Sequence, residues 1–436
     1  MIGRSFINCN ICFAMTVSPH FAFRGGVLHA ENVPLPTLAE RFGTPLYVYS
    51  KKALHDAWGA YQQATANRNV LVCYGMKANS NLAVLNEFRK LGAGFDIVSG
   101  GELARVLAIG GDPAKVVFSG VGKQVWEMQA ALKAGVKCFN VESEPELERL
   151  AQVAQDMGKV APVSLRVNPD VDAQTHPYIS TGLKENKFGI AIEDAPAVYQ
   201  RALAYGSLDI VGVDCHIGSQ ITEVSPYLDA LDKLLVLIAK LADLGVNIRH
   251  LDLGGGIGIR YTDETPLTPT MLLDKVFERL QGRGLDHLQI VLEPGRSLVG
   301  NAGVLLTTVE YLKHTEAKNF AIVDAAMNDL IRPTLYEAWH SVEQVVAPPA
   351  GREAATYDIV GPICESGDWL ARDRHLGLAQ GDLLAIMSAG AYAFTMASQY
   401  NTRPRAAEVM VDDQAFTVVR PREELDSLFA TEVTLD

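Results

Sequence analysis

The chain has 436 residues, of which 48% are hydrophobic and 20% charged, and its formal net charge is −13. These values are typical of a globular protein that is long enough for one large domain and a smaller one. The acidic balance disfavours nucleic acid and anionic membranes as partners, and no uninterrupted apolar run is long enough to span a bilayer. Small molecules and other protein subunits remain as partners.

The N-terminal residues and the cysteines both favour a cytoplasmic location. Residues 1–14 lack the sustained apolar core of a signal peptide, because two asparagines interrupt it. We expect residues 1–20 to form a disordered extension. The six cysteines are scattered through the chain, as is usual for reduced thiols. Cys9 and Cys12 form a C-x-x-C pair, but no second pair or neighbouring histidine completes a zinc site, so we expect no metal.

Short β-branched runs alternate with helix-periodic segments between about residues 70 and 300. Eight buried-type strands in such an alternation predict an α/β fold, a (β/α)₈ TIM-type barrel over residues 50–300. The expected strands are Val70–Lys77, Phe95–Ser99, Lys115–Gly120, Cys138–Ser143, Val163–Pro169, Ile210–Gly218, His250–Gly256 and Gln289–Gly295. The expected helices are Leu82–Leu91, Glu102–Ile109, Gln124–Ala134, Glu144–Met157 and Tyr227–Leu244.

Polar residues and glycines gather where these expected strands end. They are Lys77, Asp96, Ser99, Ser119, Glu142, Arg166, Asn168, His216, Gly254–Gly256, Glu293 and Arg296. The active site of such a barrel lies at the C-terminal ends of its strands, because the loops that lead to the helices converge there. The concentration of polar residues at one end therefore predicts a catalytic rim.

The last third of the chain has a different pattern. Strand-like segments joined by loops rich in Pro, Gly and Asp predict a mainly β domain over residues 301–436. Residues 21–49 contain two more short strand-like segments, Val27–Leu28 and Leu46–Tyr49, which are too short to stand alone. We expect residues 21–49 to complete the β domain from the other end of the chain.

Two of the rim features suit a phosphorylated aldehyde. Lys77 ends an apolar strand, and a desolvated amine with a lowered pKa can form a Schiff base, although a lysine that reaches solvent would look the same. The run Gly254–Gly256 offers bare backbone N–H groups to an anion, and the alternative is a tight turn without a ligand.

Two further features could complete a site for a heterocycle. Glu293 could hold a proton on a ring nitrogen and Arg296 could bind a carboxylate or phosphate, while a structural ion pair would explain either one alone. His216 could be a metal ligand, a base, a flat group that stacks on a ring, or a buried core residue. Taken together, the four features match the requirements of pyridoxal phosphate.

Several motifs occur in the order seen in one known family. They are YGMKANSN (Tyr74–Asn81), FDIVSGGE (Phe95–Glu102), HIGSQ (His216–Gln220), GGG (Gly254–Gly256), EPGRS (Glu293–Ser297), MNDLIRPTLY (Met327–Tyr336), CESGD (Cys364–Asp368) and GAY (Gly390–Tyr392). With them the chain resembles the fold type III pyridoxal-phosphate decarboxylases, and most closely the diaminopimelate decarboxylases. The resemblance extends from about residue 25 to 425.

The resemblance implies a role for individual residues around the cofactor. Lys77 would be the Schiff-base lysine, with Asp96 as a supporting residue beside it. His216 would stack on the cofactor ring, and Glu293 would pair with the pyridine nitrogen. The residues that it places around the phosphate are Ser219, Gly254, Gly255, Gly256, the turn of Glu293, Pro294, Gly295 and Arg296, and Tyr392.

The same resemblance implies the substrate and the assembly. Diaminopimelate keeps a distal carboxylate and a distal ammonium, for which the family uses Arg296, Arg332, Tyr336, Glu365 and Tyr392. Cys364 would be the catalytic acid that returns a proton to carbon. In the family Cys364 and Glu365 would reach the cofactor of a second subunit, so we expect a homodimer with shared active sites.

Other functions stay open at the level of the sequence. A related enzyme with the same cofactor could act on ornithine, arginine or carboxynorspermidine, or could racemise an amino acid. A non-catalytic pyridoxal-phosphate protein is disfavoured because Lys77 and Cys364 are both present. A metal-dependent barrel lyase would use His216, Asp252 and Glu293.

Overall fold

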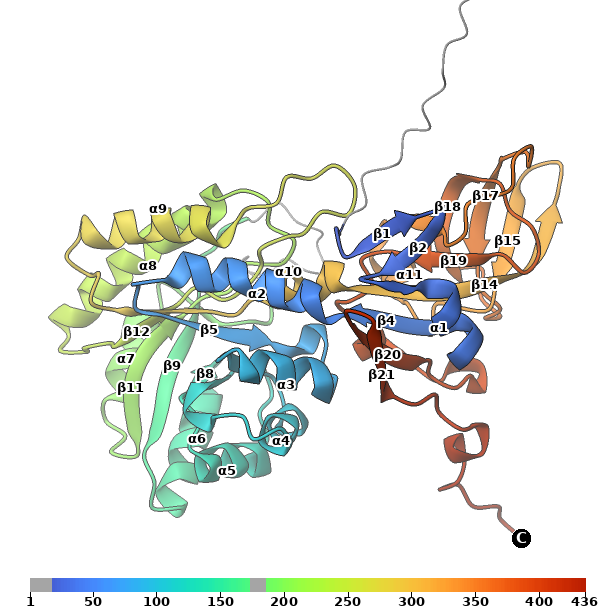
Figure 1. Ribbon diagram of the computed structural model, residues 1–436. Coiled ribbons are helices and arrows are strands. Elements are labelled where there is room, and N and C mark those ends of the chain that lie inside the picture. The colour runs from blue at the N-terminus through green and yellow to red at the C-terminus, as the bar shows by residue number, and fades with distance from the viewer. Residues whose placement is uncertain (1–17, 173–185) are drawn as a thin grey trace, which may run out of the picture.

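A closed parallel barrel is followed by a mainly β domain in the computed structural model, which describes residues 18–172 and 186–436 (Figure 1). This confirms the fold class predicted from the sequence. Of the predicted extension 1–20, only the last three residues are described, and Nε2 of His20 lies 2.9 Å from Oδ2 of Asp56. The C-x-x-C pair lies outside the described residues.

The barrel strands follow one another around the ring in chain order. They are β5 (Val70–Gly75), β6 (Gly94–Ile97), β7 (Val116–Phe118), β8 (Cys138–Val141), β9 (Ala161–Asn168), β11 (Leu208–Asp214), β12 (His250–Asp252) and β13 (Gln289–Leu292). β13 pairs in parallel with β5 and so closes the ring. A short strand, β10 (Ile190–Ala191), adds to β9.

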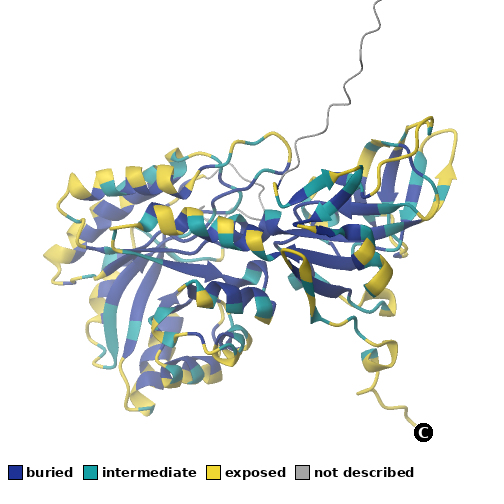
Figure 2. Ribbon diagram, viewed as in Figure 1, coloured by how far each residue is buried: buried dark blue, intermediate teal, exposed yellow. Residues whose placement is uncertain are grey.

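Helices cover the outside of the barrel and bury one face each against the strands (Figure 2). They are α2 (Lys51–Thr65), α3 (Leu82–Lys90), α4 (Gly100–Ala108), α5 (Val125–Ala134), α6 (Glu144–Asp156), α7 (Ala195–Ala202), α8 (Ser225–Asp243) and α9 (Pro269–Gln281). Local capping sets several of their starts: Ser99 and Ser143 accept the N–H of the third helical residue of α4 and α6. The sequence analysis did not predict α7 and α9, although each has a proline in its first turn.

At the catalytic rim, the strands predicted from the sequence extend beyond the strand ends in the structure. β12 ends at Asp252, because Gly254 and Gly256 adopt φ angles of 66° and 105°, which extended strands do not use. β11 likewise ends at Asp214 rather than at Gly218. The residues beyond these ends form the loops of the site.

An apolar cluster closes the barrel beneath that rim. It consists of Cys73, Val117, Cys138, Val211 and Val291, which come from five different barrel strands. These residues form a group separate from the layer that packs under the helices, so they fill the barrel interior. The polar groups at the rim therefore lie above a layer of buried apolar side chains.

The β domain is built from both ends of the chain. Its main sheet has the strand order β18-β17-β15-β14-β4-β20-β21, and β16 and β19 pair off this path. The strands are β4 (Leu46–Ser50), β14 (Gly303–His314), β15 (Asn319–Val323), β16 (Val342–Gln344), β17 (Ala355–Val360), β18 (Trp369–Leu376), β19 (Leu383–Ile386), β20 (Ala407–Asp412) and β21 (Ala415–Arg420). The N-terminal strand β4 lies between β14 and β20, so the predicted N-terminal completion of the sheet is present.

Smaller elements link the two parts. A hairpin sheet of β1 (Phe21–Arg24), β2 (Val27–Ala30) and β3 (Val33–Pro34) precedes α1 (Leu35–Phe42). The short helices α10 (Arg296–Val299) and α11 (Arg332–Tyr336) follow β13 and β15 and carry predicted site residues.

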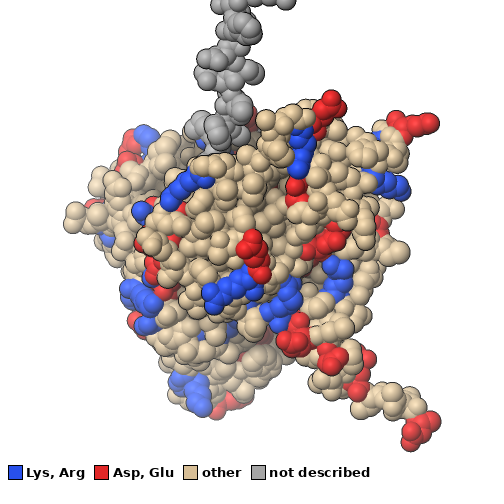
Figure 3. All heavy atoms as spheres, turned by 45° about the vertical axis from the view of Figure 1, so that its right-hand side comes forward, with Lys and Arg blue, Asp and Glu red and all other residues tan. Residues whose placement is uncertain are grey.

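No helix within residues 18–172 and 186–436 is long and apolar enough to cross a bilayer. Acidic and basic side chains are interspersed on the face shown in Figure 3.

Candidate active site

A cavity of about 360 Å³ opens at the C-terminal ends of the barrel strands. A volume of this size suits a small molecule. Five of the residues singled out in the sequence line it: Lys77, Ser119, Arg166, His216 and Glu293. The other lining residues are Val98, Gly120, Val121 and Phe188. The predicted catalytic rim therefore contains a cavity that can hold a ligand.

Lys77 projects into this cavity from the turn that follows β5. Its Nζ donates to Asp96 Oδ2 of β6 at 2.7 Å, and the Asp96 side chain is fully buried. Burial lowers the pKa of Lys77, but its interaction with Asp96, and to a smaller extent those with Tyr392 and Glu293, outweighs burial and holds the pKa above its usual value. The expected lowered pKa is thus wrong for the amine in this acidic surrounding.

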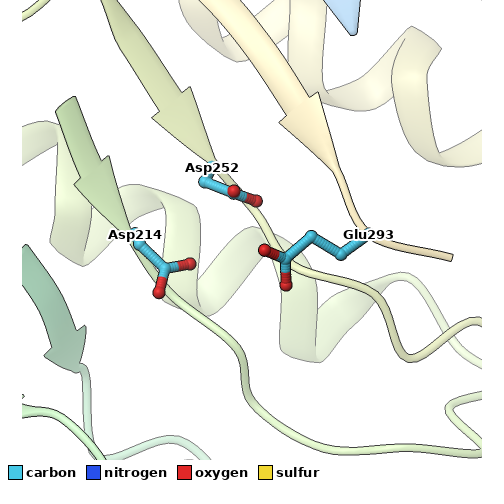
Figure 4. Close-up of side chains that lie close together, drawn as sticks. All are labelled: Asp214, Asp252 and Glu293. Carbon is cyan, nitrogen blue, oxygen red and sulfur yellow. The ribbon is translucent and has the colours of Figure 1, made fainter. Parts of the chain in front are cut away.

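Three carboxyl groups meet at the floor of the cavity (Figure 4). Asp214 and Asp252 are register partners at the ends of β11 and β12, and Glu293 follows β13. One oxygen of each lies within 4.8 Å of the others, and all three side chains are buried. Burial, followed by the charge of Asp252, raises the pKa of Glu293 and of Asp214 well above the usual range. Burial also raises the pKa of Asp252, to about 6.

Two neutral side chains orient Glu293. Ser119 Oγ donates to Glu293 Oε1 at 3.2 Å, and Asn140 Nδ2 donates to the same oxygen at 3.3 Å. Asn140 also donates to Ser119 Oγ at 3.0 Å, so the two donors support each other. This arrangement fixes the orientation of the carboxyl group.

His216 is held as a neutral ring. The backbone N–H of Gly255 donates to its Nδ1 at 3.2 Å, so Nδ1 is an acceptor and the proton lies on Nε2. Desolvation, followed by the positive charges of Arg166 and Lys77, lowers the pKa of His216 well below its usual value. A neutral flat ring beside the cavity is suited to stacking.

The glycine run brings bare backbone close to the other loops. A Cβ on Gly255 would lie 2.1 Å from the carbonyl oxygen of Glu293, and one on Gly254 would lie 2.6 Å from His216 Nδ1. Tyr227 donates from its hydroxyl to the Gly255 carbonyl at 2.9 Å and so fixes the turn. Only glycine fits here without displacing the backbone of the neighbouring loop.

Arg296 faces the glycine side of the site with a guanidinium that forms no ion pair among the described residues. Its Nε and Nη2 donate to Ser219 Oγ at 3.3 and 3.1 Å, and its Nη1 donates to the hydroxyl of Tyr261 at 2.7 Å. The ring of Tyr392 lies 4.9 Å from the guanidinium carbon. A buried cation with only neutral partners is suited to an anion.

A second buried guanidinium, that of Arg332, lies on the other side of Tyr261. The ring of Tyr261 is 4.9 Å from the guanidinium carbon of Arg332 and 6.0 Å from that of Arg296. Tyr336, on the same short helix as Arg332, interacts electrostatically with both arginines. The three residues Arg296, Arg332 and Tyr336 are thus brought together, as the sequence analysis expected.

Cys364 and Glu365 are the two residues that the sequence analysis expects to act in the site of a second subunit. Both are exposed, and neither lines the cavity that holds Lys77. The backbone N–H of Cys364 donates to Asn401 Oδ1 at 3.1 Å, and the hydroxyl of Tyr400 donates to Glu365 Oε1 at 2.6 Å.

Comparison with known proteins decides the family. A family model described as pyridoxal-dependent decarboxylase, pyridoxal binding domain, matches residues 51–300. The chain is 63% identical to the diaminopimelate decarboxylase of Pseudomonas aeruginosa over 95% of this chain and 99% of that protein. It is 58% identical to the enzyme of that name from Vibrio cholerae over 94% of this chain and 97% of that protein. The chain belongs to the diaminopimelate decarboxylase family.

Solved structures of the diaminopimelate decarboxylase family have the same fold. The enzyme from Helicobacter pylori, complexed with L-lysine, is 42% identical with a TM-score of 0.87, over 91% of this chain and 99% of that chain. The enzyme from M. jannaschii, in co-complex with L-lysine, is 36% identical with a TM-score of 0.91, over 97% of this chain and 99% of that chain. These matches confirm the family resemblance seen in the motifs.

The site geometry fits the cofactor of this pyridoxal-dependent family. Arg296 and the glycine backbone would suit the anion end of the cofactor, His216 would suit its ring face, and Glu293 would suit its ring nitrogen. Asp214 Oδ1 and Asp252 Oδ2 are buried without a hydrogen-bond partner, so the floor carries surplus acceptor capacity that suits a protonated ring nitrogen above it. Pyridoxal phosphate is therefore the cofactor.

Of the three ligands named for the metal-dependent alternative, Asp252 and Glu293 lie together but His216 does not join them. The carboxyl cluster contains Asp214 rather than His216, and within the described residues no group of potential metal ligands includes His216.

Several side chains that shape this site were not predicted from the sequence. Asp214 could have been found, since an acid stands at the same position of two neighbouring strands. Tyr261 and His340 lie a few residues beyond the motifs Gly254–Gly256 and Met327–Tyr336, and their contacts with Arg296 and Arg332 depend on loop geometry that no local pattern indicates.

Proposed function

We propose that this chain decarboxylates meso-2,6-diaminopimelate to L-lysine and carbon dioxide, the last step of lysine formation. One observation supports this substrate above the others. Beyond the anion end of the cofactor site lies a second buried guanidinium, that of Arg332, which forms no ion pair among the described residues. Ornithine and arginine have no second carboxylate to place there, whereas diaminopimelate keeps one throughout the reaction. The relatives with lysine bound are consistent with this choice.

Individual residues of the chain would have the following roles in binding the cofactor and in the reaction. When bound, pyridoxal phosphate supplies the electron-withdrawing ring that stabilises the charge left on carbon as carbon dioxide departs. Lys77 would hold the cofactor through Nζ, and Asp96 would keep that amine oriented. Glu293 would hold a proton at the ring nitrogen, and His216 would cover one ring face. Arg296, with Ser219 and the Gly254–Gly256 backbone, would bind the phosphate.

The buried apolar side chains beneath the site strengthen the electrostatic interactions of these residues. The carboxyl cluster lies above buried apolar side chains and beneath the cavity, where charges interact more strongly than in water. Arg166 donates to Glu142 Oε1 at 2.9 Å and lies 4.8 Å from the ring of Phe188, so its charge is held at the cavity wall.

We propose in addition that the active unit is a homodimer in which Cys364 and Glu365 reach the partner's cavity. The exposure of both residues, away from the cavity of their own chain, supports this arrangement. Cys364 would then return a proton to carbon, and Glu365 would bind the distal ammonium group. We also propose a cytoplasmic location, which suits the free thiols of Cys73, Cys138 and Cys215.

Product analysis tests the reaction directly. Purified protein with pyridoxal phosphate is incubated with meso-diaminopimelate, and lysine and carbon dioxide are measured. Parallel incubations contain ornithine, arginine or carboxynorspermidine. Preferred turnover of any of these three would contradict the proposal. Lys77→Ala serves as the control and should lose both activity and the absorbance of the bound cofactor.

Mixing two inactive variants tests the shared site. Lys77→Ala and Cys364→Ala, each inactive alone, should regain about a quarter of the wild-type activity after equal mixing and subunit exchange, since half of the dimers then hold one intact site. No recovery in a mixture shown to exchange subunits would mean that Cys364 does not act across an interface.

A further inference from the structure

His340 is a completely buried histidine outside the cofactor site, in the loop after α11. Both of its ring nitrogens have a partner. Nδ1 lies 2.8 Å from the carbonyl oxygen of Met387, and Nε2 lies 2.8 Å from Nη1 of Arg332. A carbonyl can only accept and a guanidinium can only donate, so Nδ1 carries the proton and Nε2 accepts from Arg332. The contacts thus define a single tautomer.

The ring stays neutral in this position. Burial, followed by the positive charge of Arg332, lowers the pKa of His340 to about 3. A protonated ring would have to face the Arg332 guanidinium with a second N–H. At neutral pH the histidine therefore acts as a fixed acceptor.

Arg332 is buried, yet its partners are incomplete. Its Nε has no hydrogen-bond partner, and the guanidinium forms no ion pair among the residues the structure describes. Burial, in part opposed by Tyr261, lowers the pKa of Arg332. Leaving a buried guanidinium without an anion is unfavourable, so the group is arranged for a ligand that supplies one.

The ring of Tyr261 contacts both Arg332 and His340. Its ring lies 4.9 Å from the guanidinium carbon of Arg332 and meets the His340 ring edge-on, with centroids 5.5 Å apart at 81°. Its hydroxyl accepts from Arg296 Nη1 at 2.7 Å. The same tyrosine therefore contacts both the arginine of the cofactor end and the arginine beyond it.

We infer that His340 is a positioning residue that, with the ring of Tyr261, orients Arg332 toward the carboxylate that the substrate keeps. This inference rests on the proposed function, because it needs a substrate with a second carboxylate. His340 holds Nη1 from behind, and the tyrosine ring restricts the guanidinium plane. The other N–H groups of Arg332 are thereby presented in one orientation, which a long flexible side chain would not keep by itself.

A change at His340 should affect substrate binding at Arg332 but not binding of the cofactor. The retained carboxylate is bound equally before and during the loss of carbon dioxide, so a looser Arg332 raises KM and leaves kcat unchanged. The cofactor is held by residues that His340 does not touch. Its absorbance and its dissociation constant should therefore stay at the wild-type values.

The test compares His340→Leu with His340→Gln in the holoenzyme. Leucine removes the acceptor, and KM for meso-diaminopimelate should rise about tenfold with kcat within about twofold. Glutamine can donate to Met387 and accept from Arg332, so it should restore KM. The inhibition constant of lysine, which keeps the carboxylate, should rise in parallel, while that of 1,5-diaminopentane, which lacks it, should not change.

Each outcome separates the inference from the proposed function. Wild-type protein that releases no carbon dioxide from meso-diaminopimelate refutes the function itself. Active wild-type protein with an unchanged KM in His340→Leu, or an equal rise for lysine and the diamine, refutes the positioning role alone. Should His340→Leu not fold, as judged by circular dichroism, His340→Asn replaces it, because asparagine can reach Met387 or Arg332 but not both. A KM that rises in His340→Asn and returns to the wild-type value in His340→Gln supports the inference. Equal KM values in the two variants overturn it.

Discussion

Replacing Asp252 by asparagine should stabilise the cofactor-free protein, because this carboxyl group is buried with two others. It accepts from the backbone N–H of Gly254 with Oδ1 at 2.9 Å, and Oδ2 has no partner. Asparagine keeps the accepting oxygen and removes the charge. The variant therefore retains the contact that shapes the glycine turn and loses the repulsion from Glu293 and Asp214.

The size and pH dependence of the effect follow from the pKa. Burial raises the pKa of Asp252 from 3.8 to about 6, so the folded protein keeps this proton at pH values where the unfolded chain has lost it. The free energy of unfolding of the wild type therefore falls as the pH rises from about 4 to about 6, and the loss is complete above that. At 1.36 kcal/mol per pH unit the loss amounts to about 3 kcal/mol at pH 8 and roughly half of that at pH 5.

Urea unfolding of the cofactor-free proteins at pH 5 and pH 8 measures this difference. Asp252→Asn should have the higher midpoint, and its advantage should be larger at pH 8. Asp286→Asn, at an exposed position, serves as the matched control and should change stability by less than about 0.5 kcal/mol. An Asp252→Asn variant that is less stable at pH 8, or that gains equally at both pH values, would refute the reasoning.

Three further changes probe other contacts. Gly255→Ala places a Cβ 2.1 Å from the Glu293 carbonyl and should weaken pyridoxal-phosphate binding at least about tenfold by fluorescence titration, while Gly59→Ala, with no atom within 4 Å, should not. Glu293→Gln cannot hold the ring-nitrogen proton as a carboxylate does, and kcat should fall about a hundredfold or more in steady-state assays. Glu142→Gln weakens the buried pair with Arg166 and should lower the free energy of unfolding by about 3 kcal/mol, measured in urea.

Local patterns were enough to predict much of this molecule. The alternation of apolar runs and helical periodicity identified the barrel, because strand and helix periods are set by backbone geometry. Lys77, His216 and Glu293 were recognisable because each follows a strand, and parallel strands bring their C-terminal ends to one rim. The motif order then predicted the family and the cofactor.

Contacts between distant segments could not be deduced in the same way. Tyr261, in the loop after β12, meets Arg332 and His340 only because the β domain packs against the barrel rim, and no periodicity encodes that approach. The pKa of Lys77 was misjudged for the same reason, since its value depends on acids from three other strands and loops rather than on its own apolar strand. Sequence by itself determined which elements form and which side chains stand at their ends. The closed barrel and its packing decided which charges meet in a low-dielectric interior, because electrostatic energy depends on distance in space and not along the chain.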